Sequence, residues 1–348
     1  MLDYIVVGFG LAGLSFVEQL ELNNRSFCVF ENYSQKSSRV AGGLFNPVIL
    51  KRFTPAWSAQ EQLEKSIPFY RNIETKLQES LVIDLPILRR FNSIEEQNTW
   101  FEACDKPILN QFLSTKLLKN SNLALDIPYS YGKVKHTGRI DIKGMLSAYL
   151  RYLDQKKCLV NESFEYNELI INEDFVAYNG LKAKNIIFTE GFGIKNNPLF
   201  NYLPVVGNKG EYIIIKSEAL QLEEAVKSSV FIIPLGDNHY KIGATYNHDD
   251  KSPEITNTAR KEIQKKLERF LKVDYEVVGQ VAGIRPTVRD RRPLAGTHPD
   301  YQNVHILNGL GSRGILIGPT TAEHLYNHIE HNISLSKECD IERFEKLR

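Results

Sequence analysis

The chain has 348 residues, of which 42% are hydrophobic and 24% charged, and its formal net charge is +1 at pH 7. These values are typical of a globular protein and give no general indication of nucleic-acid or membrane binding. No apolar run reaches the length of about 18 residues that a membrane-spanning helix needs, and no signal peptide is recognised. The four cysteines stand far apart. We therefore expect a cytoplasmic protein with free thiols and no membrane partner.

The first thirty residues carry a glycine motif between two apolar segments. YIVV (4–7) is typical of a buried strand, GFGLAG (8–13) follows without a spacer, and a helical pattern leads to a second strand, FCVF (27–30). In a dinucleotide-binding unit the first glycine permits the turn, the second admits the pyrophosphate and the third lets helix and strand pack closely. Free N–H groups at the helix N-terminus favour the anion. The expected cofactor contacts are Gly8, Gly10, Leu11, Ala12 and Gly13.

Glu31 ends the second strand, where such units carry an acid. A carboxylate there accepts hydrogen bonds from a ribose diol and repels a 2′-phosphate, which argues against NADP. Asn32, the next residue, is a second expected contact. The motif does not by itself distinguish NAD from FAD.

The remaining patterns alternate between helical and strand-like segments. In chain order, we expect a small-residue loop at 37–48, mostly helix over 55–120, an amphipathic helix at 141–157, a strand ending in glycine at 185–193, strands over 204–248, a polar helix at 256–271 and turn-rich segments from 281 to 311.

Several segments together resemble one family of FAD enzymes, that of D-amino-acid oxidase, glycine oxidase and sarcosine oxidase. They are the glycine motif with its downstream acid, SSRVAGG (37–43), TEGFG (189–193), GIRPTVRDRRPLAG (283–296) and GLGSRGILIGPTTAEHL (309–325). The last of these is also similar to the FAD domain of the bifunctional enzymes that mature 5-methylaminomethyl-2-thiouridine in tRNA. We expect no methyltransferase domain of the kind those enzymes carry, because the first FAD strand opens the chain.

The resemblance and the element order predict an α/β fold. We expect a Rossmann-like FAD-binding domain interleaved with an α+β substrate domain on a mostly antiparallel sheet. The expected ranges are 1–54, 130–203 and 275–348 for the FAD-binding domain, and 55–129 and 204–274 for the substrate or cap domain.

The resemblance also implies extended FAD, with its adenosine end at the glycine motif and Glu31. Residues implied along the ribityl chain and ring are Ser38, Arg39, Ala41, Gly42 and Gly43. Thr189, Glu190 and Gly191 are implied near the pyrophosphate, and backbone at Leu169 near the adenine. The last block supplies Gly311, Ser312, Arg313, Gly314 and Ile315, where a helix N-terminus would face flavin N1/C2=O. Since 37–48 and 282–300 contain no cysteine, and 37–48 no histidine, we expect FAD to be non-covalent.

In this family a C–N bond of an amino or imino acid is oxidised by hydride transfer to flavin N5, and no dedicated base is needed. The resemblance assigns the substrate carboxylate to Arg285, since a guanidinium makes two parallel charge-assisted bonds. The alternative is a structural arginine paired with Asp290 or another acid. Arg313 is either a second contact at the substrate mouth or flavin edge, or a surface arginine neutralising an acid.

Lys241 matches a lysine that sarcosine-oxidase-like relatives hold near flavin N5 to promote the reaction with oxygen; the alternative is a solvated strand lysine. The candidates for the substrate wall are Tyr212, Tyr240 and Tyr246, for which ordinary sheet packing is the alternative. A metal site is not expected, because the residues that share one C-terminal helix face lack further ligands: His324, His328 and His331.

Three functions follow from these features. The first is an FAD-dependent oxidase or dehydrogenase of a small amino or imino acid or an N-substituted glycine, with oxygen or another electron acceptor. The second is an FAD enzyme that removes a carboxymethyl group from a tRNA wobble uridine, which requires tRNA as partner. The third is an NAD-linked or non-catalytic dinucleotide-binding protein.

Overall fold

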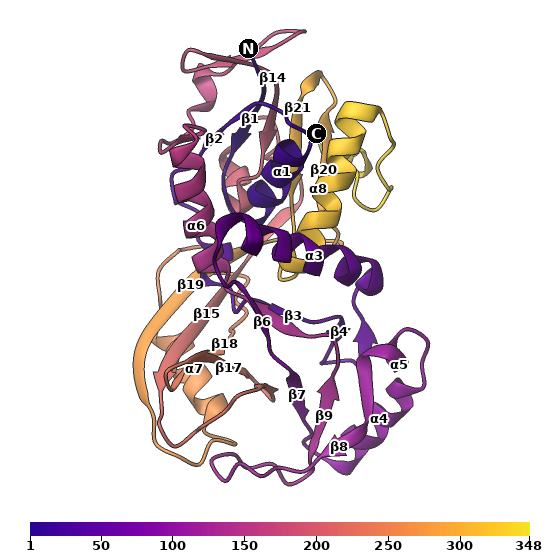
Figure 1. The fold of residues 1–348 in the computed structure, drawn as a ribbon, viewed down its shortest axis with the longest axis vertical. Coiled ribbons are helices and arrows are strands. Elements are labelled where there is room, and N and C mark those ends of the chain that lie inside the picture. Colours follow the sequence, from indigo (N-terminus) through magenta and orange to yellow (C-terminus); the bar gives the residue numbers. More distant parts are fainter.

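The computed structural model describes residues 1–348 as two lobes stacked along the long axis (Figure 1). Both chain termini lie in the upper lobe, away from the lower one. Each lobe is built on an eight-stranded sheet, and the chain passes between the lobes several times. No helix combines the length and the apolar character needed to cross a membrane.

The upper sheet has a parallel centre. Its parallel strands, in spatial order, are β11 (Leu159–Val160), β2 (Phe27–Phe30), β1 (Leu2–Val7), β14 (Leu181–Phe188) and β21 (Tyr301–Asn308). Antiparallel strands complete it: β12 (Ile170–Ile171), β13 (Val176–Tyr178) and β20 (Leu294–His298). β1 and β2 are buried along almost their whole length, as strands covered on both faces must be.

Four long helices cover the upper sheet or connect it to the lower lobe: α1 (Leu11–Leu22), α3 (Ala59–Leu77), α6 (Ile142–Gln155) and α8 (Gly314–His331). The shorter helical segments are α2 (Ser37–Val40) and the 3₁₀ turns Tyr166–Glu168, Gly191–Asn196 and Ile341–Leu347. α1 and α8 approach closely, because a Cβ on Gly318 would stand 2.8 Å from the Ser15 hydroxyl. The N-termini of both helices therefore lie in the same region of the lobe.

The lower sheet is antiparallel apart from the β16–β7 pair. Its strands, in spatial order, are β19 (Glu276–Val288), β15 (Val205–Lys216), β18 (His239–Gly243), β17 (Phe231–Gly236), β16 (Ala225–Lys227), β7 (Ile87–Arg90), β9 (Tyr131–Val134) and β8 (Leu113–Leu118). α7 (Asn257–Leu267) packs on it, and α4 (Ile94–Cys104) and α5 (Leu109–Phe112) lie beside β8 (Figure 1). Short strands complete the fold: β3 (Leu44–Phe45), β10 (Gly138–Ile140) and β6 (Val82–Asp84) in one small sheet, and β4 (Val48–Ile49) with β5 (Thr54–Pro55).

Three apolar clusters hold these layers together. The largest has 52 buried residues and joins α1, α3, α6 and α8 to the adjoining part of the lower lobe. A second lies on the other face of the upper sheet, and a third lies between the lower sheet and α7. Continuity of the largest cluster across both lobes predicts that they behave as one packed body.

The fold class expected from the sequence is confirmed, including the interleaving of two domains and the mostly antiparallel second sheet. The helix expected over most of 55–120 is wrong in part, because β6, β7 and β8 lie in this segment. ILRR of β7 pairs with β9 and β16, and such long-range pairing overrides local helical pattern. Since β9 and β19 pair in the lower sheet, we propose moving them from the FAD-binding ranges to the substrate domain.

Candidate functional site

The glycine motif forms a tight turn between β1 and α1. Gly8 has a φ of +92°, and a Cβ on Gly13 would stand 2.3 Å from the Gly8 carbonyl oxygen. Thr189, at the end of β14, donates its hydroxyl to that same carbonyl at 2.6 Å. Gly10 caps α1 without a side chain, and the Leu11 N–H meets only the Ser38 hydroxyl, at 3.2 Å. The N-terminus of α1 is therefore surrounded only by backbone and small side chains. This arrangement suits the binding of a phosphate.

Glu31 is buried beside this turn. Its carboxylate accepts hydrogen bonds from the Phe9 N–H and, at 2.7 Å, from the Tyr33 N–H. Each carboxylate oxygen keeps a further lone pair. Next to it, Asn32 donates to the Ser163 hydroxyl at 3.2 Å.

Leu169 packs, partly buried, with the apolar cluster on one face of the upper sheet, and the position of its backbone near the adenine stays a prediction. The segment that meets the Glu31 end lies earlier in the chain, where Tyr33 also donates its hydroxyl to Asn161 at 3.0 Å. Asn161 and Ser163 belong to no motif, so no sequence signal points to them.

Arg39 reaches from α2 toward the same region. Its guanidinium lies 5.2 Å from the Tyr33 ring, and Nη1 donates to the Ser147 hydroxyl at 3.3 Å. Nη2 is buried and has no hydrogen-bond partner. A buried cationic donor without a partner is costly unless an anion satisfies it. Together with the glycine cradle, Arg39 therefore fits a cofactor that carries phosphate groups.

Ala41, Gly42 and Gly43 form a turn that faces the lower sheet. Gly43 has a φ of +77°, and a Cβ on Gly42 would stand 2.7 Å from Ile233 Cδ1. Lys241, on β18, donates its ammonium to the Ala41 carbonyl at 2.9 Å. The Ala41–Gly43 turn thus places its backbone close to the Lys241 ammonium, which belongs to the other lobe.

Lys241 is largely buried, and its pKa is lowered to about 8. Burial is the largest cause, the charges of Arg139 and Lys143 act in the same direction, and Asp141 opposes them. Its ammonium lies 5.1 Å from the centre of the Tyr212 ring. The structure therefore brings Lys241 and Tyr212 together beside the turn. A solvated strand lysine would not be held in this way.

Tyr240 is different from the other two tyrosines. It alternates with Lys241 along β18, and it is buried in the cluster under α7, where its hydroxyl accepts from the Leu222 N–H. The expectation that Tyr240 forms part of the substrate wall is wrong, because neighbouring residues of a strand point to opposite faces.

Arg285, on β19, lies on the same sheet face as Tyr212. Its Nη1 donates to Asn208 Oδ1 at 3.4 Å and to the Thr245 carbonyl at 3.3 Å. The centre of the guanidinium lies 4.7 Å from the ring of Tyr246, which is 66% exposed.

Arg285 makes no ion pair with any acidic residue of the chain. Asp290, the partner considered from the sequence, is bound instead by Arg343 Nε at 2.9 Å. An arginine without an acidic partner on one face of the lower sheet, called the cap sheet from here on, is available to an external anion.

The GLGSRG block lies against the end of β19. The Gly311 N–H donates to the Pro286 carbonyl at 3.1 Å, and Leu310 forms a bridge with Thr287. α8 then begins at Gly314, with Arg313 as its N-cap and Ile315 in its first turn. Ser312 lies in the turn before it, and no side chain caps the helix. The N-terminus of α8 therefore keeps free N–H groups near the Arg285 strand.

Arg313 is mostly buried, and burial lowers its pKa. Its Nη1 donates to the Asn46 carbonyl at 3.3 Å, and it makes no ion pair. It is therefore not a surface arginine that neutralises an acid.

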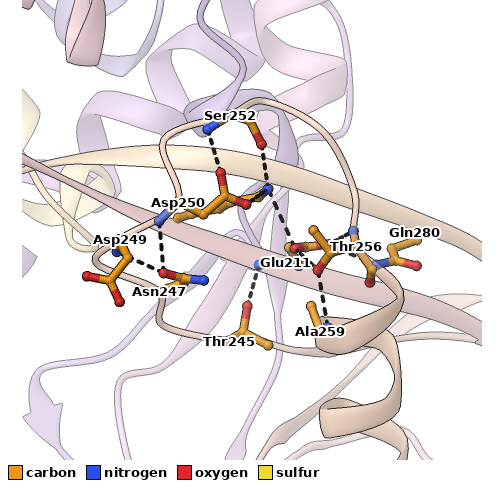
Figure 2. Close-up of polar contacts among 10 residues, drawn as sticks. Glu211, Thr245, Asn247, Asp249, Asp250, Ser252, Thr256, Ala259 and Gln280 are labelled. Carbon is orange, nitrogen blue, oxygen red and sulfur yellow. Dashed lines mark hydrogen bonds and ion pairs between the residues drawn. The ribbon is translucent and has the colours of Figure 1, made fainter.

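A buried polar network supports the segment that carries Tyr246. Figure 2 shows Glu211 facing Thr256 and Gln280, with Asp250 and Ser252 on the loop above. The Glu211 carboxylate accepts from the Thr256 N–H and from Gln280, both at 2.8 Å. The Lys209 ammonium, 1% exposed, pairs with Asp250 at 2.5 Å. The network ties the start of α7 and the preceding loop to β15.

The structure has no group of three or more His, Cys, Asp or Glu side chains placed to hold a metal ion. His324 and His328 are half-buried on α8 and His331 is exposed. All four cysteines are free thiols.

A parallel sheet with a glycine turn at its first strand, capped by an antiparallel sheet that presents cations, defines a two-domain dinucleotide-binding protein. The family model described as "FAD dependent oxidoreductase" matches residues 3–327. The chain therefore belongs to this family, and FAD rather than NAD is its dinucleotide.

The curated relatives include two tRNA 5-methylaminomethyl-2-thiouridine biosynthesis bifunctional proteins. The protein of Legionella pneumophila is 23% identical over 216 residues, which cover 53% of this chain and 32% of that protein. The protein of Idiomarina loihiensis is 26% identical over 151 residues, which cover 41% and 25%. The match therefore spans at most a third of either relative.

Solved structures share the whole fold. Glycine oxidase from Bacillus cereus has a TM-score of 0.77 at 17% identity, covering 96% of each chain. Iminodiacetate oxidase from Chelativorans has a TM-score of 0.74 at 17% identity, covering 97% of this chain and 98% of that one. L-α-Glycerophosphate oxidase from Mycoplasma pneumoniae, solved with FAD bound, has a TM-score of 0.75 at 17% identity, covering 97% and 96%.

The carboxyl group of Glu190, next to the glycine turn, allows a test of how burial shifts a pKa in this region. Burial raises its pKa to about 7, while hydrogen bonds from Asn197 and Tyr166 act in the opposite direction. The folded protein therefore holds a proton that the unfolded chain releases at lower pH. The free energy of unfolding should fall by about 3 kcal/mol as pH rises from about 4.5 to 7 because of this group alone.

We expect Glu190→Gln to remove this part of the pH dependence, measured by urea unfolding at pH 5, 6, 7 and 8. Glu173→Gln, at an exposed position, is the control and should leave the dependence unchanged. Parallel pH curves for wild type and Glu190→Gln would contradict the assignment.

Proposed function

We propose that this protein oxidises the C–N bond of a small amino or imino acid, or of an N-substituted glycine, and that Arg285 binds the substrate carboxylate. The observation that carries the proposal is the position of Arg285 on the cap sheet. It lies on the sheet face that meets the Ala41–Gly43 turn, without an acidic partner. A guanidinium in that state suits a carboxylate, which it binds through two parallel bonds.

The residues present fit FAD. Gly8, Gly10 and Gly13 would admit the pyrophosphate at the N-terminus of α1, and the partnerless Nη2 of Arg39 would satisfy an anionic oxygen. Glu31 keeps lone pairs for the ribose diol. FAD, when bound, supplies an acceptor for the two electrons and the hydrogen that leave the substrate carbon.

The protein's own part is orientation and electrostatics. Arg285 would fix the carboxylate, and with it the direction in which the substrate's α-carbon faces the Ala41–Gly43 turn. The amine itself supplies the electron pair that forms the C=N bond, so no side-chain base is required once the nitrogen is neutral. Arg313 and the uncapped N-terminus of α8 provide positive potential where charge accumulates during the reaction.

Two solved structures with the same fold support this substrate class by their names, glycine oxidase and iminodiacetate oxidase. Both names describe amines that carry a carboxylate close to the nitrogen.

The experiment is anaerobic mixing of the flavin-loaded protein with glycine, sarcosine, proline, iminodiacetate and D-amino acids. We expect at least one of them to bleach the flavin band. Arg285→Ala should lower kcat/KM for that substrate by about a hundred-fold or more, because hydrogen bonds to charged groups contribute about 1.5–3 kcal/mol each. Arg289→Ala, at an exposed position four residues away, is the control. An Arg285→Ala variant with unchanged KM would contradict the proposal.

A second candidate is oxidation of a carboxymethylaminomethyl group on tRNA, favoured by the curated relatives. This group is an N-substituted glycine, so Arg285 would serve in the same way. The discriminating arm of the experiment is tRNA that carries the group. Bleaching by this tRNA alone, with binding that weakens steeply as salt rises, would select this candidate over a free amino acid.

Lys241 is proposed to promote the reaction with oxygen, because its ammonium is held beside the proposed flavin turn. Its pKa of about 8 means that the cation is present below pH 8 and lost above it. Reoxidation of the reduced protein by oxygen should therefore slow as pH rises through about 8.

We expect Lys241→Met to slow this step by at least about ten-fold below pH 8 and to flatten the pH profile, as loss of a preorganised charge would. The measurement is stopped-flow reoxidation, and Lys116→Met, at an exposed position on β8, is the control. Equal rates for wild type and Lys241→Met at every pH would exclude the role.

FAD is proposed to be non-covalent, since the segments that carry the attachment residue in some relatives contain no cysteine at 37–48 or 282–300 and no histidine at 37–48. Acid precipitation should release all of the flavin into the supernatant, measured by absorbance. Flavin that stays with the pellet after washing would show a covalent link.

A further inference from the structure

We propose that Gly210 is a positioning residue: its missing side chain is what lets Arg285 lie flat across β15 in the orientation that binds a carboxylate. This inference rests on the proposed function of Arg285. Gly210 precedes Tyr212 by two residues and therefore shares its sheet face.

The guanidinium occupies the volume that a side chain at position 210 would need. A Cβ built on Gly210 would stand 2.0 Å from Arg285 Nη2, 2.3 Å from Cζ and 2.4 Å from Nη1. Three atoms at such similar distances mean that the guanidinium plane covers the glycine. No residue with a side chain allows this position of Arg285.

The hydrogen bonds of Arg285 fix which edge remains available. Nη1 donates to two acceptors of the protein, Asn208 Oδ1 and the Thr245 carbonyl. Neither Nε nor Nη2 donates a hydrogen bond within the protein. Both atoms keep some contact with solvent, since neither is among the buried polar atoms that lack a partner. The Nε–Nη2 edge is the fork that binds a carboxylate side-on through two parallel bonds. Gly210, Asn208 and Thr245 together therefore aim this edge.

Gly210→Ala tests the inference, because the atoms that the methyl group meets are the far end of a flexible side chain. The fold should survive, and Arg285 should shift. The matched control is Gly279→Ala on β19, where the new Cβ would make only ordinary contacts of 3.4 Å with Ile214. Thermal unfolding and circular dichroism establish that each variant is folded.

The readouts are the dissociation constant of acetate, measured by calorimetry on the FAD-loaded protein, and the separate kcat and KM values for a substrate that bleaches the flavin. Gly210→Ala should weaken acetate binding and raise KM by about ten-fold or more, with a much smaller change in kcat. Gly279→Ala should match the wild type. A Gly210→Ala variant that binds acetate as tightly as the wild type would overturn the inference.

A double variant shows whether Gly210 acts through Arg285. In the Arg285→Ala background there is no guanidinium to displace, so adding Gly210→Ala should change acetate binding by no more than about two-fold. A further large loss would overturn the inference, since Gly210 would then act on the backbone. If Arg285→Ala itself binds acetate normally, the proposed function fails and this inference with it. If Gly210→Ala does not fold, Asn208→Ala carries the test, because it removes one acceptor of Nη1 and should also weaken acetate binding.

Discussion

The structure depends on one junction, where the end of β19 in the lower sheet meets the loop that leads into α8. The hydrogen bond from the Gly311 N–H to the Pro286 carbonyl and the bridge between Leu310 and Thr287 hold it together. Because α8 also packs closely on α1 at Gly318, the junction sets the cap sheet against the helix that follows the glycine turn. The proposed carboxylate site and the proposed phosphate site lie on different sheets, and the junction holds them in a fixed relative position, which a reaction between two bound molecules requires.

The two faces of the cap sheet carry different kinds of side chain. On β15, Asn208 and Gly210 face the proposed site, whereas Lys209 and Glu211 turn to α7 and its preceding loop. Alternation along a strand makes this separation unavoidable, so one strand can hold a buried ion pair and a substrate-facing surface at once. The ion pair fixes the loop that presents Tyr246, and Tyr246 in turn contacts Arg285. Rigid support behind a loop residue is what keeps a binding group in place before the substrate arrives.

The sequence predicted those parts whose chemistry is local. A glycine turn between strand and helix has fixed spacing, so Gly8, Gly10 and Gly13 could be recognised, as could the end of β2 at Glu31. Asn161 and Ser163 were not predicted, because the segment that lies beside the end of β2 is chosen by the pairing of β11 with β2, far apart in the chain. Tyr240 failed for a related reason: residues 239–243 read as a strand, but only the register of β18 against β15 says which of its side chains face the turn.

The role proposed for Gly210 could not be predicted from the sequence, for a physical reason. A glycine within a strand indicates a bulge or a close approach, but the approaching group comes from a different strand 75 residues later. Asn208 lies opposite Arg285 in the β15–β19 register, and only that register brings the guanidinium over Gly210. The orientation of the proposed carboxylate-binding edge of Arg285 is thus a property of strand pairing rather than of the GIRP motif. An arginine in the same motif on a differently paired strand would carry the same charge without the same direction.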